Sequence, residues 1–205
     1  MLKLKKELRM SERNNLFPVF LKLEALQTLI VGGGNVGLEK LTAVLKNSPA
    51  AKVTLVARTI QDGIRELAQN HAHVTLFERN FKLWDLWEKD LVILATDNRQ
   101  LHETIRNFAR TRRLLVNVAD TPELCDFYLG SVVTKGNLKI GVSTNGKSPT
   151  ISKRIREYLE EALPDDVDEL LNNMQKIRGR IKGDFKQKVK VLNDITTSWL
   201  AQAES

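Results

Sequence analysis

Short apolar runs alternate with stretches of helical periodicity through the first part of the chain. The apolar runs are rich in β-branched residues and lack polar alternation, which is typical of parallel strands buried on both faces. They predict strands at Thr28–Val31, Val53–Val56, Val74–Leu76, Leu91–Ala95 and Leu114–Val118. Helices are predicted between them at Val36–Lys46, Ile60–Gln69 and Gln100–Arg112. The alternation predicts an α/β fold with a Rossmann-like, doubly wound parallel sheet.

The pattern changes after Val118. Two further apolar runs, Leu129–Thr134 and Leu138–Val142, flank the sequence Lys135-Gly136-Asn137. Two strand-like runs on either side of a short glycine-containing turn predict an antiparallel hairpin. Because an isolated pair of strands is only marginally stable in water, we expect this hairpin to join the first sheet or the strands of another subunit.

The rest of the chain has helical periodicity. Ser148 is a plausible N-cap with Pro149 at the first helical position, and Pro164 ends this helix. A second long helical region is predicted from about Asp166 to Leu200. We therefore expect a Rossmann-type domain over residues 1–118, whose first 14 residues are flexible or form a surface helix, a strand-rich segment over 119–147 and a helical domain over 148–205.

An apolar stripe in the last helical region is flanked by a row of cations. The stripe consists of Ile177, Ile181, Phe185, Val189 and Leu192, and the row of Arg178, Lys182, Lys186 and Lys190. The row is either an ordinary solvated flank beside a packing face or a basic wall over a cleft for an anionic ligand. Both interpretations stay open at this point.

A glycine motif joins the first predicted strand to the first predicted helix. Gly32, Gly34 and Gly37 form the pattern Gly-x-Gly-x-x-Gly. In a dinucleotide-binding turn the first glycine permits the tight turn, the second lets a pyrophosphate approach the backbone, and the third lets the helix pack closely. The N-terminal N–H groups of that helix then face the anion. The flanking strand and helix favour dinucleotide binding over a purely structural turn.

Composition narrows the class of partner. The chain of 205 residues has a formal net charge of +7, which suggests an acidic partner. Aromatic residues make up only 6% of the chain and are not interleaved with basic ones, which disfavours nucleic acid. No amphipathic segment has the bulky apolar face of a membrane-surface helix. A polycarboxylate or phosphate ligand is the third class, and the charge alone does not choose among the three.

Other features exclude further classes of protein. The single cysteine, Cys125, allows no internal disulfide and fits a reducing, cytoplasmic compartment. No uncharged run approaches the roughly 20 residues that span a bilayer, and no apolar segment of a secretory signal follows the basic N-terminal stretch. None of the three histidines is spaced as in a metal motif, so we expect no preassembled transition-metal site. His71 and His73 are predicted at the surface, and His102 on a helix face.

Carboxylates follow two of the predicted strands. Asp97 comes directly after the fourth strand, and Asp120 comes directly after the fifth. Because ligands of doubly wound sheets bind at the carboxyl ends of the strands, both are candidates to face the reacting end of a cofactor. A carboxylate there could accept a proton, fix a substrate N–H or bind a divalent metal ion. The alternative for each is a helix N-cap or an Asx turn, and the following Thr121-Pro122 favours a functional role for Asp120.

The acid that usually binds a ribose 2′-hydroxyl is missing. The second predicted strand ends in Val56-Ala57 and is followed by Arg58, near the position expected for that carboxylate. An arginine there weakens the case for NAD and allows the 2′-phosphate of NADP.

Several motifs together resemble the precorrin-2 dehydrogenase/sirohydrochlorin ferrochelatase family, the NAD-binding part of sirohaem synthases. They span about Leu16 to Leu163 in the family's order and spacing, and jointly they are specific. They are Leu16-Phe17-Pro18-Val19-Phe20, Val31-Gly32-Gly33-Gly34-Asn35-Val36 with Lys40, Ala95-Thr96-Asp97, Asn117-Val118-Ala119-Asp120, Cys125-Asp126-Phe127, and Ser143-Thr144-Asn145-Gly146-Lys147-Ser148-Pro149 with Arg154 and Arg156.

The resemblance implies a function and a set of partners. It implies NAD-dependent oxidation of precorrin-2 to sirohydrochlorin, and in bifunctional members insertion of Fe²⁺ to give sirohaem. It also implies a homodimer whose contact is the strand-rich segment 119–147, with the helical domain closing the cleft. A substrate with many carboxylates would explain the basic balance. The chain has no segment like the methyltransferase domain, so we expect a separate enzyme to supply precorrin-2.

The resemblance also implies roles for particular residues. Asp120 matches the proposed catalytic aspartate, a candidate base that also handles the metal ion. The cofactor set is Gly32, Gly33, Gly34, Asn35, Val36, Gly37, Arg58, Thr96 and Asp97. The substrate set is Asn117, Ser143, Thr144, Asn145, Gly146, Lys147, Ser148 and Arg154. NAD is the implied cofactor, since family members commonly lack the ribose acid and still use NAD, although Arg58 leaves NADP open.

Two other functions compete with the enzyme. A regulatory module that senses NAD(H) would need neither Asn117–Asp120 nor Ser143–Pro149, so the presence of these segments favours catalysis. A chelatase without dehydrogenase activity would not need Gly32, Gly34 and Gly37 together.

Overall fold

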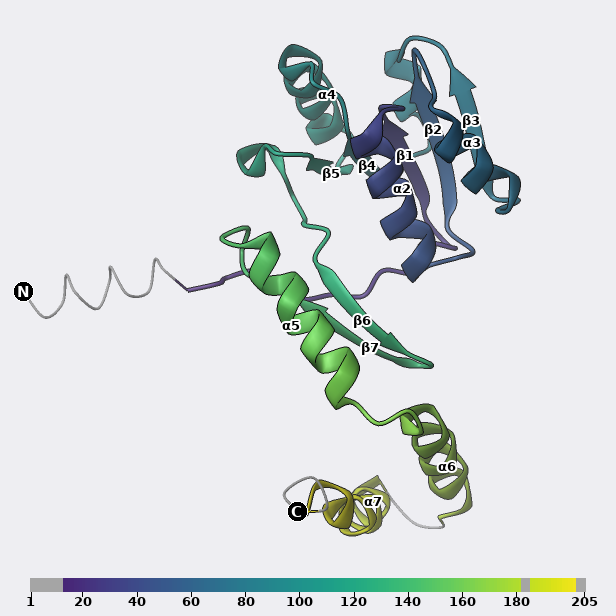
Figure 1. Cartoon of the computed structure of the whole chain (residues 1–205), viewed down its shortest axis with the longest axis vertical. Coiled ribbons are helices and arrows are strands. Elements are labelled where there is room, and N and C mark those ends of the chain that lie inside the picture. Colours follow the sequence, from purple (N-terminus) through teal and green to yellow (C-terminus); the bar gives the residue numbers. More distant parts are fainter. Residues whose placement is uncertain (1–12, 182–184, 202–205) are drawn as a thin grey trace, which may run out of the picture. The chain divides into compact units, whose positions relative to one another are not determined.

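A computed structural model of the chain describes residues 13–181 and 185–201. Its first part is a five-stranded parallel sheet in the order β3-β2-β1-β4-β5 (Figure 1). The strands are β1 (Gln27–Val31), β2 (Lys52–Ala57), β3 (Val74–Glu78), β4 (Leu91–Leu94) and β5 (Leu115–Val118). The sheet confirms the predicted α/β, Rossmann-like fold. The predicted helix or flexible segment at the N-terminus lies outside the described residues up to position 12.

Apolar residues on the central strands bury both faces of the sheet. Leu29 and Val31 point to one face and pack in a core with Ile105 of α4 (Arg99–Thr111). Ile30 points to the other face and packs in a core with Leu41 of α2 (Asn35–Asn47) and with side chains of α3 (Asp62–Gln69). This division explains why the strands read as uninterrupted apolar runs, because every side chain on them meets a helix layer.

The second predicted helix, Ile60–Gln69, begins later in the structure for an identifiable reason. α3 begins at Asp62, two residues later than predicted. The N–H of Ile60 donates to Glu78 Oε1 at 3.0 Å, and the N–H of Gln61 donates to the carbonyl of Gly33 at 3.0 Å. These contacts hold the chain extended until the helix begins. A short 3₁₀ helix, η1 (Leu83–Leu86), and a second, η2 (Pro122–Leu124), complete the connections.

The predicted hairpin is present as a separate sheet. β6 (Ser131–Lys135) pairs antiparallel with β7 (Leu138–Val142), and within the described residues neither strand joins the five-stranded sheet. Of the two alternatives expected for the hairpin, joining the first sheet is excluded, and pairing with strands of another subunit stays a prediction. Asp168 closes the hairpin turn, because its Oδ1 accepts hydrogen bonds from the backbone N–H of Asn137 at 2.7 Å and from its side-chain amide at 2.8 Å.

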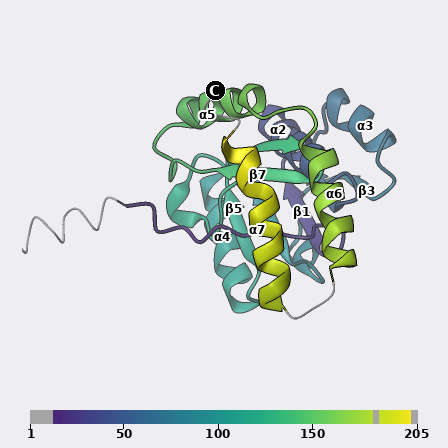
Figure 2. The same cartoon turned by 90° about the horizontal axis from the view of Figure 1, so that it is seen from below.

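Three helices follow the hairpin. α5 (Pro149–Ala162) begins at the proline that was predicted to start it. The long helical region predicted over 166–200 is divided into α6 (Val167–Arg180) and α7 (Phe185–Ala201), which Figure 2 shows as separate helices. Ile181 has an extended backbone with ψ 120°, and glycine at position 179 weakens the helix end. The predicted stripe and cationic row therefore do not lie on one helix, and Lys182 is outside the described residues.

The chain is divided into two compact units. One comprises the sheet and its helices up to residue 130 together with residues 143–149, and the other comprises 131–142 and the chain from 150 onward. Among the helices that the structure describes, none combines the length and the apolar character needed to cross a membrane.

Candidate functional site

A pocket opens at the point where the strand order of the sheet reverses. β1 and β4 are neighbours there, and their connections leave in opposite directions, which is where doubly wound sheets bind ligands. The pocket has a volume of about 920 Å³. It is lined by Val31, Gly32, Gly33, Gly34, Val56, Ala57, Arg58, Thr59, Asn80, Phe81, Ala95, Thr96, Asp97, Asn98, Arg99 and Leu101.

Three of the four glycines between the end of β1 and the first turns of α2 are required by the protein itself. A Cβ atom on Gly32 would lie 2.1 Å from the carbonyl oxygen of Ala95, and Gly32 also has φ +129°. A Cβ on Gly33 would lie 2.2 Å from the carbonyl oxygen of Thr59, and one on Gly37 would lie 2.3 Å from that of Gly32. The absence of a side chain at these three positions lets the strands, the turn and α2 approach one another closely.

Gly34 differs from the other three glycines. A Cβ built on it has no atom of the described chain within 4 Å, so nothing in the protein needs a glycine here. Its backbone carbonyl accepts a hydrogen bond from the side-chain amide of Gln61 at 3.0 Å, which fixes the turn. Its exposed face lies in the pocket wall. The turn thus leaves a bare backbone surface toward the pocket.

The N-terminus of α2 is suited to an anion. Gly34 is its N-cap and supplies no side-chain hydrogen bond, and the first turn of α2 contains no acidic residue. The first N–H groups of a helix lack intrahelical partners and carry partial positive charge. By contrast, the N-cap of α4 is occupied, since Asn98 Oδ1 accepts from the N–H of Leu101 at 2.9 Å. The N-terminus of α2 can therefore bind a phosphate group, such as those of a dinucleotide.

A smaller pocket of about 220 Å³ adjoins the first and brings the two candidate carboxylates together. Thr96 and Asp97 line both pockets, so they form the edge between them. Asp120 lines only the smaller pocket, and so do Val36 and His102. The pocket is also lined by Ala95, Arg99, Ala119 and Thr121.

The structure decides against the capping interpretation of both aspartates. Asn98 is the N-cap of α4, so Asp97 is not, and Thr121 rather than Asp120 precedes η2. Within residues 13–181 and 185–201, no hydrogen bond to either carboxylate is formed. Asp120 is exposed and has φ +56°, a left-handed conformation that is uncommon for a residue other than glycine. Strain of this kind is concentrated at functional sites.

Several residues that line the pockets were not anticipated from the sequence. Asn80 and Phe81 come after the end of β3 and line the nucleotide-sized pocket, as Thr59 does after β2. Their positions after strand ends were the available signal. Arg99 lines both pockets and lies 3.2 Å from Glu103 and 3.6 Å from Glu123.

His102 lies on a face of α4, as predicted, and that face is buried. It is only 4% exposed, and its Nε2 lies 2.8 Å from the hydroxyl oxygen of Thr96. Burial lowers the pKa of His102 below its ordinary value. Its imidazole is therefore neutral at neutral pH. A buried histidine in a helix could not be distinguished from an exposed one by sequence alone.

Asn117 has a partner within the protein. It is buried on β5, and its side-chain amide donates to the carbonyl of Phe127 at 2.8 Å. Nearby, Asp126 receives both guanidinium ends of Arg106 at 2.6 and 2.7 Å, and also the N–H of Val116 at 3.0 Å. Burial raises the pKa of the Cys125 thiol, which donates to the carbonyl of Val118. These contacts hold the segment after η2 against β5.

The segment 143–148 is a structured turn. Ser143 Oγ accepts hydrogen bonds from the side chain of Asn14 at 3.3 Å and from the N–H of Asn145 at 3.2 Å. The N–H of Lys147 donates to the carbonyl of Thr144 at 3.1 Å. Asn145 and Gly146 both have left-handed backbones, with φ +54° and +74°. This turn belongs to the same compact unit as the two pockets.

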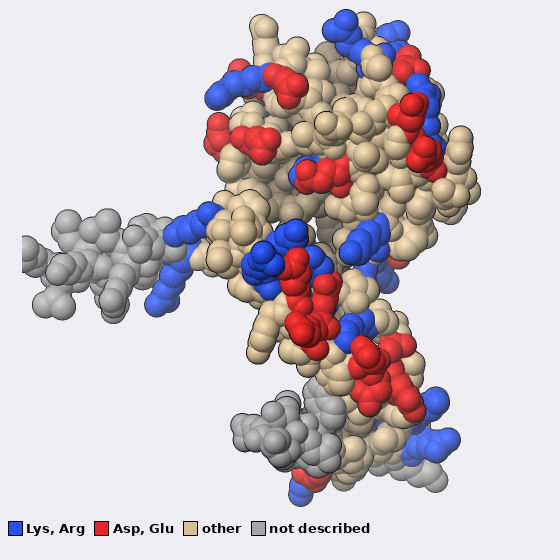
Figure 3. Space-filling model, in the orientation of Figure 1, with Lys and Arg blue, Asp and Glu red and all other residues tan. Residues whose placement is uncertain are grey.

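Positive and negative side chains are interspersed over the face of the molecule shown in Figure 3. On α5, Arg154 lies 3.1 Å from Glu157, and Arg156 is paired with Glu160. Arg154 belongs to the second compact unit. On this helix, therefore, glutamates compensate the charges of both arginines.

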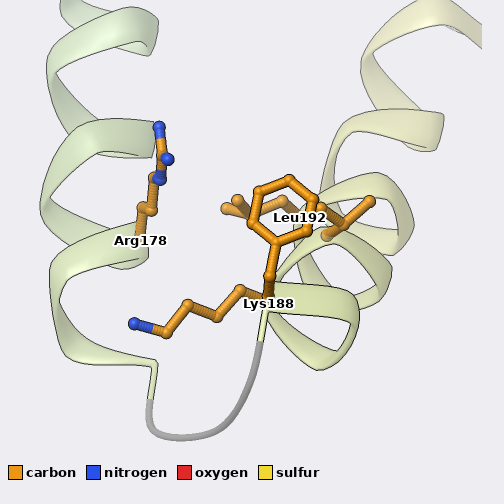
Figure 4. Close-up of a pocket in the computed structure, with 5 residues that line it drawn as sticks. Arg178, Lys188 and Leu192 are labelled. Atoms are coloured by element: carbon orange, nitrogen blue, oxygen red, sulfur yellow. The ribbon is translucent and has the colours of Figure 1, made fainter.

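A separate pocket of about 500 Å³ lies between α6 and α7. In Figure 4, Lys188 extends from α7 toward α6, and Arg178 stands on the side of α6 that faces α7. Leu192 lies with Phe185 and Val189 in the same pocket. Arg178 is the one described member of the predicted cationic row that lines it, since Lys186 and Lys190 line a different pocket on α7.

Comparisons with known proteins agree with the geometry of the sheet. A family model described as NAD(P)-binding matches residues 19–131, and one for the central part of sirohaem biosynthesis proteins matches residues 135–162. These matches support a nicotinamide cofactor for this chain. The fold is similar to the structure of SirC, a precorrin-2 dehydrogenase, with a TM-score of 0.68 and 22% identity, over 92% of this chain and 99% of that one.

Longer proteins are similar to this chain over part of their length. The siroheme synthase of Psychrobacter cryohalolentis is 35% identical over 185 residues, which are 90% of this chain and 34% of that protein. The siroheme synthase of Pseudoalteromonas atlantica is 35% identical over 174 residues, which are 85% of this chain and 37% of that protein. The chain therefore spans about a third of the length of these curated relatives.

Proposed function

The chain belongs to the NAD(P)-binding family of sirohaem biosynthesis proteins, and from this premise we propose that it oxidises precorrin-2 to sirohydrochlorin. A nicotinamide dinucleotide would occupy the larger pocket and supply a hydride acceptor. The substrate would meet it at the smaller pocket, where Asp97 and Asp120 lie. The proposal is supported by the family match and by the chemistry of both pockets.

Gly34 is the observation on which the cofactor assignment depends. No described atom of the protein would clash with a side chain at this position, so the fold itself does not need a glycine here. The glycine nevertheless leaves bare backbone at the uncapped N-terminus of α2. A pyrophosphate needs such a surface, because close approach lets backbone N–H groups donate to it. The residues present therefore fit a dinucleotide. In this arrangement Gly32, Gly33 and Gly37 shape the turn, and Asn35 and Val36 supply N–H groups of the first helical turn.

Asp120 is proposed as the group that removes a proton from the substrate. Its carboxylate is exposed in the smaller pocket and receives no hydrogen bond in the described part of the chain, so it is free to accept one. A positioned general base typically contributes about 10²–10⁴-fold to a rate. Thr96 and Asp97 would form the edge where substrate and cofactor meet.

We propose that the polar turn 143–148 and Arg154 bind the carboxylates of the substrate. The hydroxyls and backbone of Ser143, Thr144 and Ser148, with Asn145, Gly146 and Lys147, would supply donors. Asn117 would act through the backbone it fixes, because its amide already donates to Phe127. In the same proposal, residues 1–118 are the dinucleotide-binding domain, 119–147 the dimerisation segment and 148–205 the helical domain.

NAD is proposed as the cofactor, although Arg58 lies in the pocket wall. The resemblance implies NAD for family members that lack an acid at this position. Arg58 is exposed and would then lie beside the adenosine part of the cofactor without meeting a phosphate. A direct comparison of NAD⁺ with NADP⁺ decides this point.

A homodimer and a second activity are part of the proposal. The two-stranded sheet formed by β6 and β7 is marginal by itself, so strands of a second copy would complete it. The mass of the protein in solution tests this, and a monomer would contradict it. Fe²⁺ would be a substrate that Asp120 helps to deliver to sirohydrochlorin, giving sirohaem.

The test is anaerobic incubation of the full chain with precorrin-2 and either NAD⁺ or NADP⁺, followed by the absorbance of sirohydrochlorin. Asp120→Asn removes only the charge, because asparagine tolerates the left-handed backbone as aspartate does. We expect this variant to bind NADH normally and to lose turnover by about 100-fold or more. Asp62→Asn makes the same change at an exposed position on α3 and should leave turnover unchanged.

Each outcome of this test has a meaning. Turnover with NAD⁺ that is lost in Asp120→Asn supports the proposed role of the carboxylate. Near-normal turnover of that variant means that Asp120 is not the base. Binding of NADH without any oxidation by the wild-type chain would reject the enzyme and favour an NAD(H)-sensing module. Metal insertion after addition of Fe²⁺ must be faster than in a protein-free control if the chain is also a chelatase.

A further inference from the structure

His102 is a buried polar side chain that the proposed reaction does not use. It lies on α4 and is 4% exposed, yet it contributes to the wall of the smaller pocket. Arg106, one turn later on the same helix, is also buried, but its guanidinium is held by Asp126. The contacts of Arg106 join α4 to the segment after β5. The ring of His102 instead contacts the edge between the two pockets.

Thr96 connects this histidine to the glycine turn. Its hydroxyl oxygen lies 2.8 Å from Nε2 of His102 and also accepts a weaker hydrogen bond from the N–H of Asn98 at 3.4 Å. Its methyl carbon lies near Gly32, since a Cβ added to that glycine would be only 3.2 Å from it. One β-branched residue therefore contacts His102 through its hydroxyl and has its methyl group beside the first glycine of the turn.

The hydrogen bond selects one orientation of the Thr96 side chain. A threonine has few allowed values of its first side-chain torsion, and exchanging two of them exchanges the positions of the methyl and the hydroxyl. The bond to His102 stabilises the orientation in which the methyl group lies beside Gly32. Without it, the polar and apolar groups at the edge of both pockets could change places.

We propose that His102 is a positioning residue, whose imidazole holds Thr96, and through it the turn Ala95–Asn98, in the form that accepts the nicotinamide nucleotide. This inference rests on the proposed function for its ligand. A buried polar nitrogen that lacked a partner would be costly, and the hydrogen bond to Thr96 gives Nε2 of His102 its partner. The charged side chains that share the smaller pocket with His102 are those of Asp97, Asp120 and Arg99. None of these takes the place of the Thr96 hydroxyl at Nε2.

The test measures nucleotide affinity separately from stability. NADH fluorescence titrations and thermal denaturation are carried out on the full chain and on His102→Leu, which removes the hydrogen bond at similar volume. We expect His102→Leu to bind NADH about 5- to 10-fold more weakly, as expected for one lost hydrogen bond. His102→Gln retains an amide nitrogen at similar reach and should bind within about 3-fold of wild type. His73→Leu makes the same change at an exposed position and serves as the control.

A double-mutant cycle identifies the partner of His102. Thr96→Val removes the hydroxyl and keeps the shape, so it should weaken NADH binding as much as His102→Leu. The double variant should lose little more than either single variant, because both remove the same bond. Additive losses would overturn the assignment of Thr96 as the partner.

The remaining outcomes are equally decisive. Wild-type affinity in His102→Leu, with only a lower melting temperature, would show a structural histidine and reject the proposal. If wild type binds NADH but does not oxidise precorrin-2, the proposed reaction fails while the affinities still test His102. If wild type binds no nicotinamide nucleotide, both the proposed reaction and the role of His102 are rejected.

Discussion

Replacing Gly34 with alanine separates nucleotide binding from folding by a single methyl group. The new Cβ would have no atom of the described chain within 4 Å, and φ −88° with ψ −163° is a conformation that any residue can adopt. Alanine is a poorer N-cap than glycine, but it also reduces the entropy of the unfolded chain, and the two effects are of similar size. We expect the free energy of unfolding to change by less than about 1 kcal/mol.

The effect on the cofactor should be much larger. The methyl group would stand on the bare face of the turn, between the N-terminus of α2 and the anion that approaches it. Moving the pyrophosphate away would weaken or remove at least one hydrogen bond to a charged group, which contributes about 1.5–3 kcal/mol. A loss of about 2 kcal/mol corresponds to roughly 30-fold weaker binding.

Fluorescence titration with NADH measures this affinity, and thermal denaturation measures stability. Gly33→Ala is the matched control, because its Cβ would lie 2.2 Å from the carbonyl oxygen of Thr59 and 2.7 Å from the Cβ of Ala57. Overpacking of this kind should destabilise the fold by up to about 3 kcal/mol, and thus lower the melting temperature by about 6–12 °C. Wild-type NADH affinity in Gly34→Ala would refute the position of the pyrophosphate, and a large fall in its melting temperature would refute the open space.

Three further predictions concern cofactor choice, stability and pH. Arg58→Ala should leave kcat/KM for NAD⁺ within about threefold of wild type. Any residual activity with NADP⁺ should fall about tenfold, since the 2′-phosphate would lose its cation. A preference of the wild-type protein for NADP⁺ would contradict the choice of NAD. Asp126→Ala leaves Arg106 buried without its carboxylate and should lower the free energy of unfolding in urea by about 3–5 kcal/mol, and a loss below about 1 kcal/mol would contradict this. The pKa of His102 is lowered by burial below 6.5, so the unfolded chain binds this proton at higher pH than the folded chain. Its contribution to stability is therefore complete above about pH 6.5 and is lost as the pH falls below that value. Urea titrations should show a flatter profile for His102→Gln in this acidic range.

The sheet could be predicted because its signals are local and redundant. Each central strand is a run of buried apolar residues, and the glycine motif marks the connection between the first strand and its helix. The residues that line the pocket could be anticipated as far as they follow strand ends. Asn80 and Phe81 also follow a strand end, but the sequence does not indicate which of the residues after β3 line the pocket.

Other features could not be predicted because the sequence is compatible with more than one local structure. Asp97 and Asn98 are adjacent and are equally good N-caps, so only the geometry shows that Asn98 takes that position. His102 occupies a helix whose periodicity leaves its exposure ambiguous, and its partner precedes the helix. The helical stripe over 177–192 has an uninterrupted apolar period, but the helix ends at Arg180 despite it. Periodicity describes which face is buried and does not show that the helix is continuous.

The two halves of the site differ in how rigidly they are built. The nucleotide pocket is formed at the ends of β1, β2 and β4, whose neighbouring residues are almost fully buried, so its backbone is fixed by the core of the sheet. Asp120 and the turn around Asn145 instead depend on left-handed backbones in connections between elements. A left-handed residue other than glycine costs about 1–2 kcal/mol. Substitutions in these connections should therefore change turnover and substrate binding while the affinity for NADH stays the same. The rigid half would then determine cofactor binding, and the strained half the reaction that the family carries out.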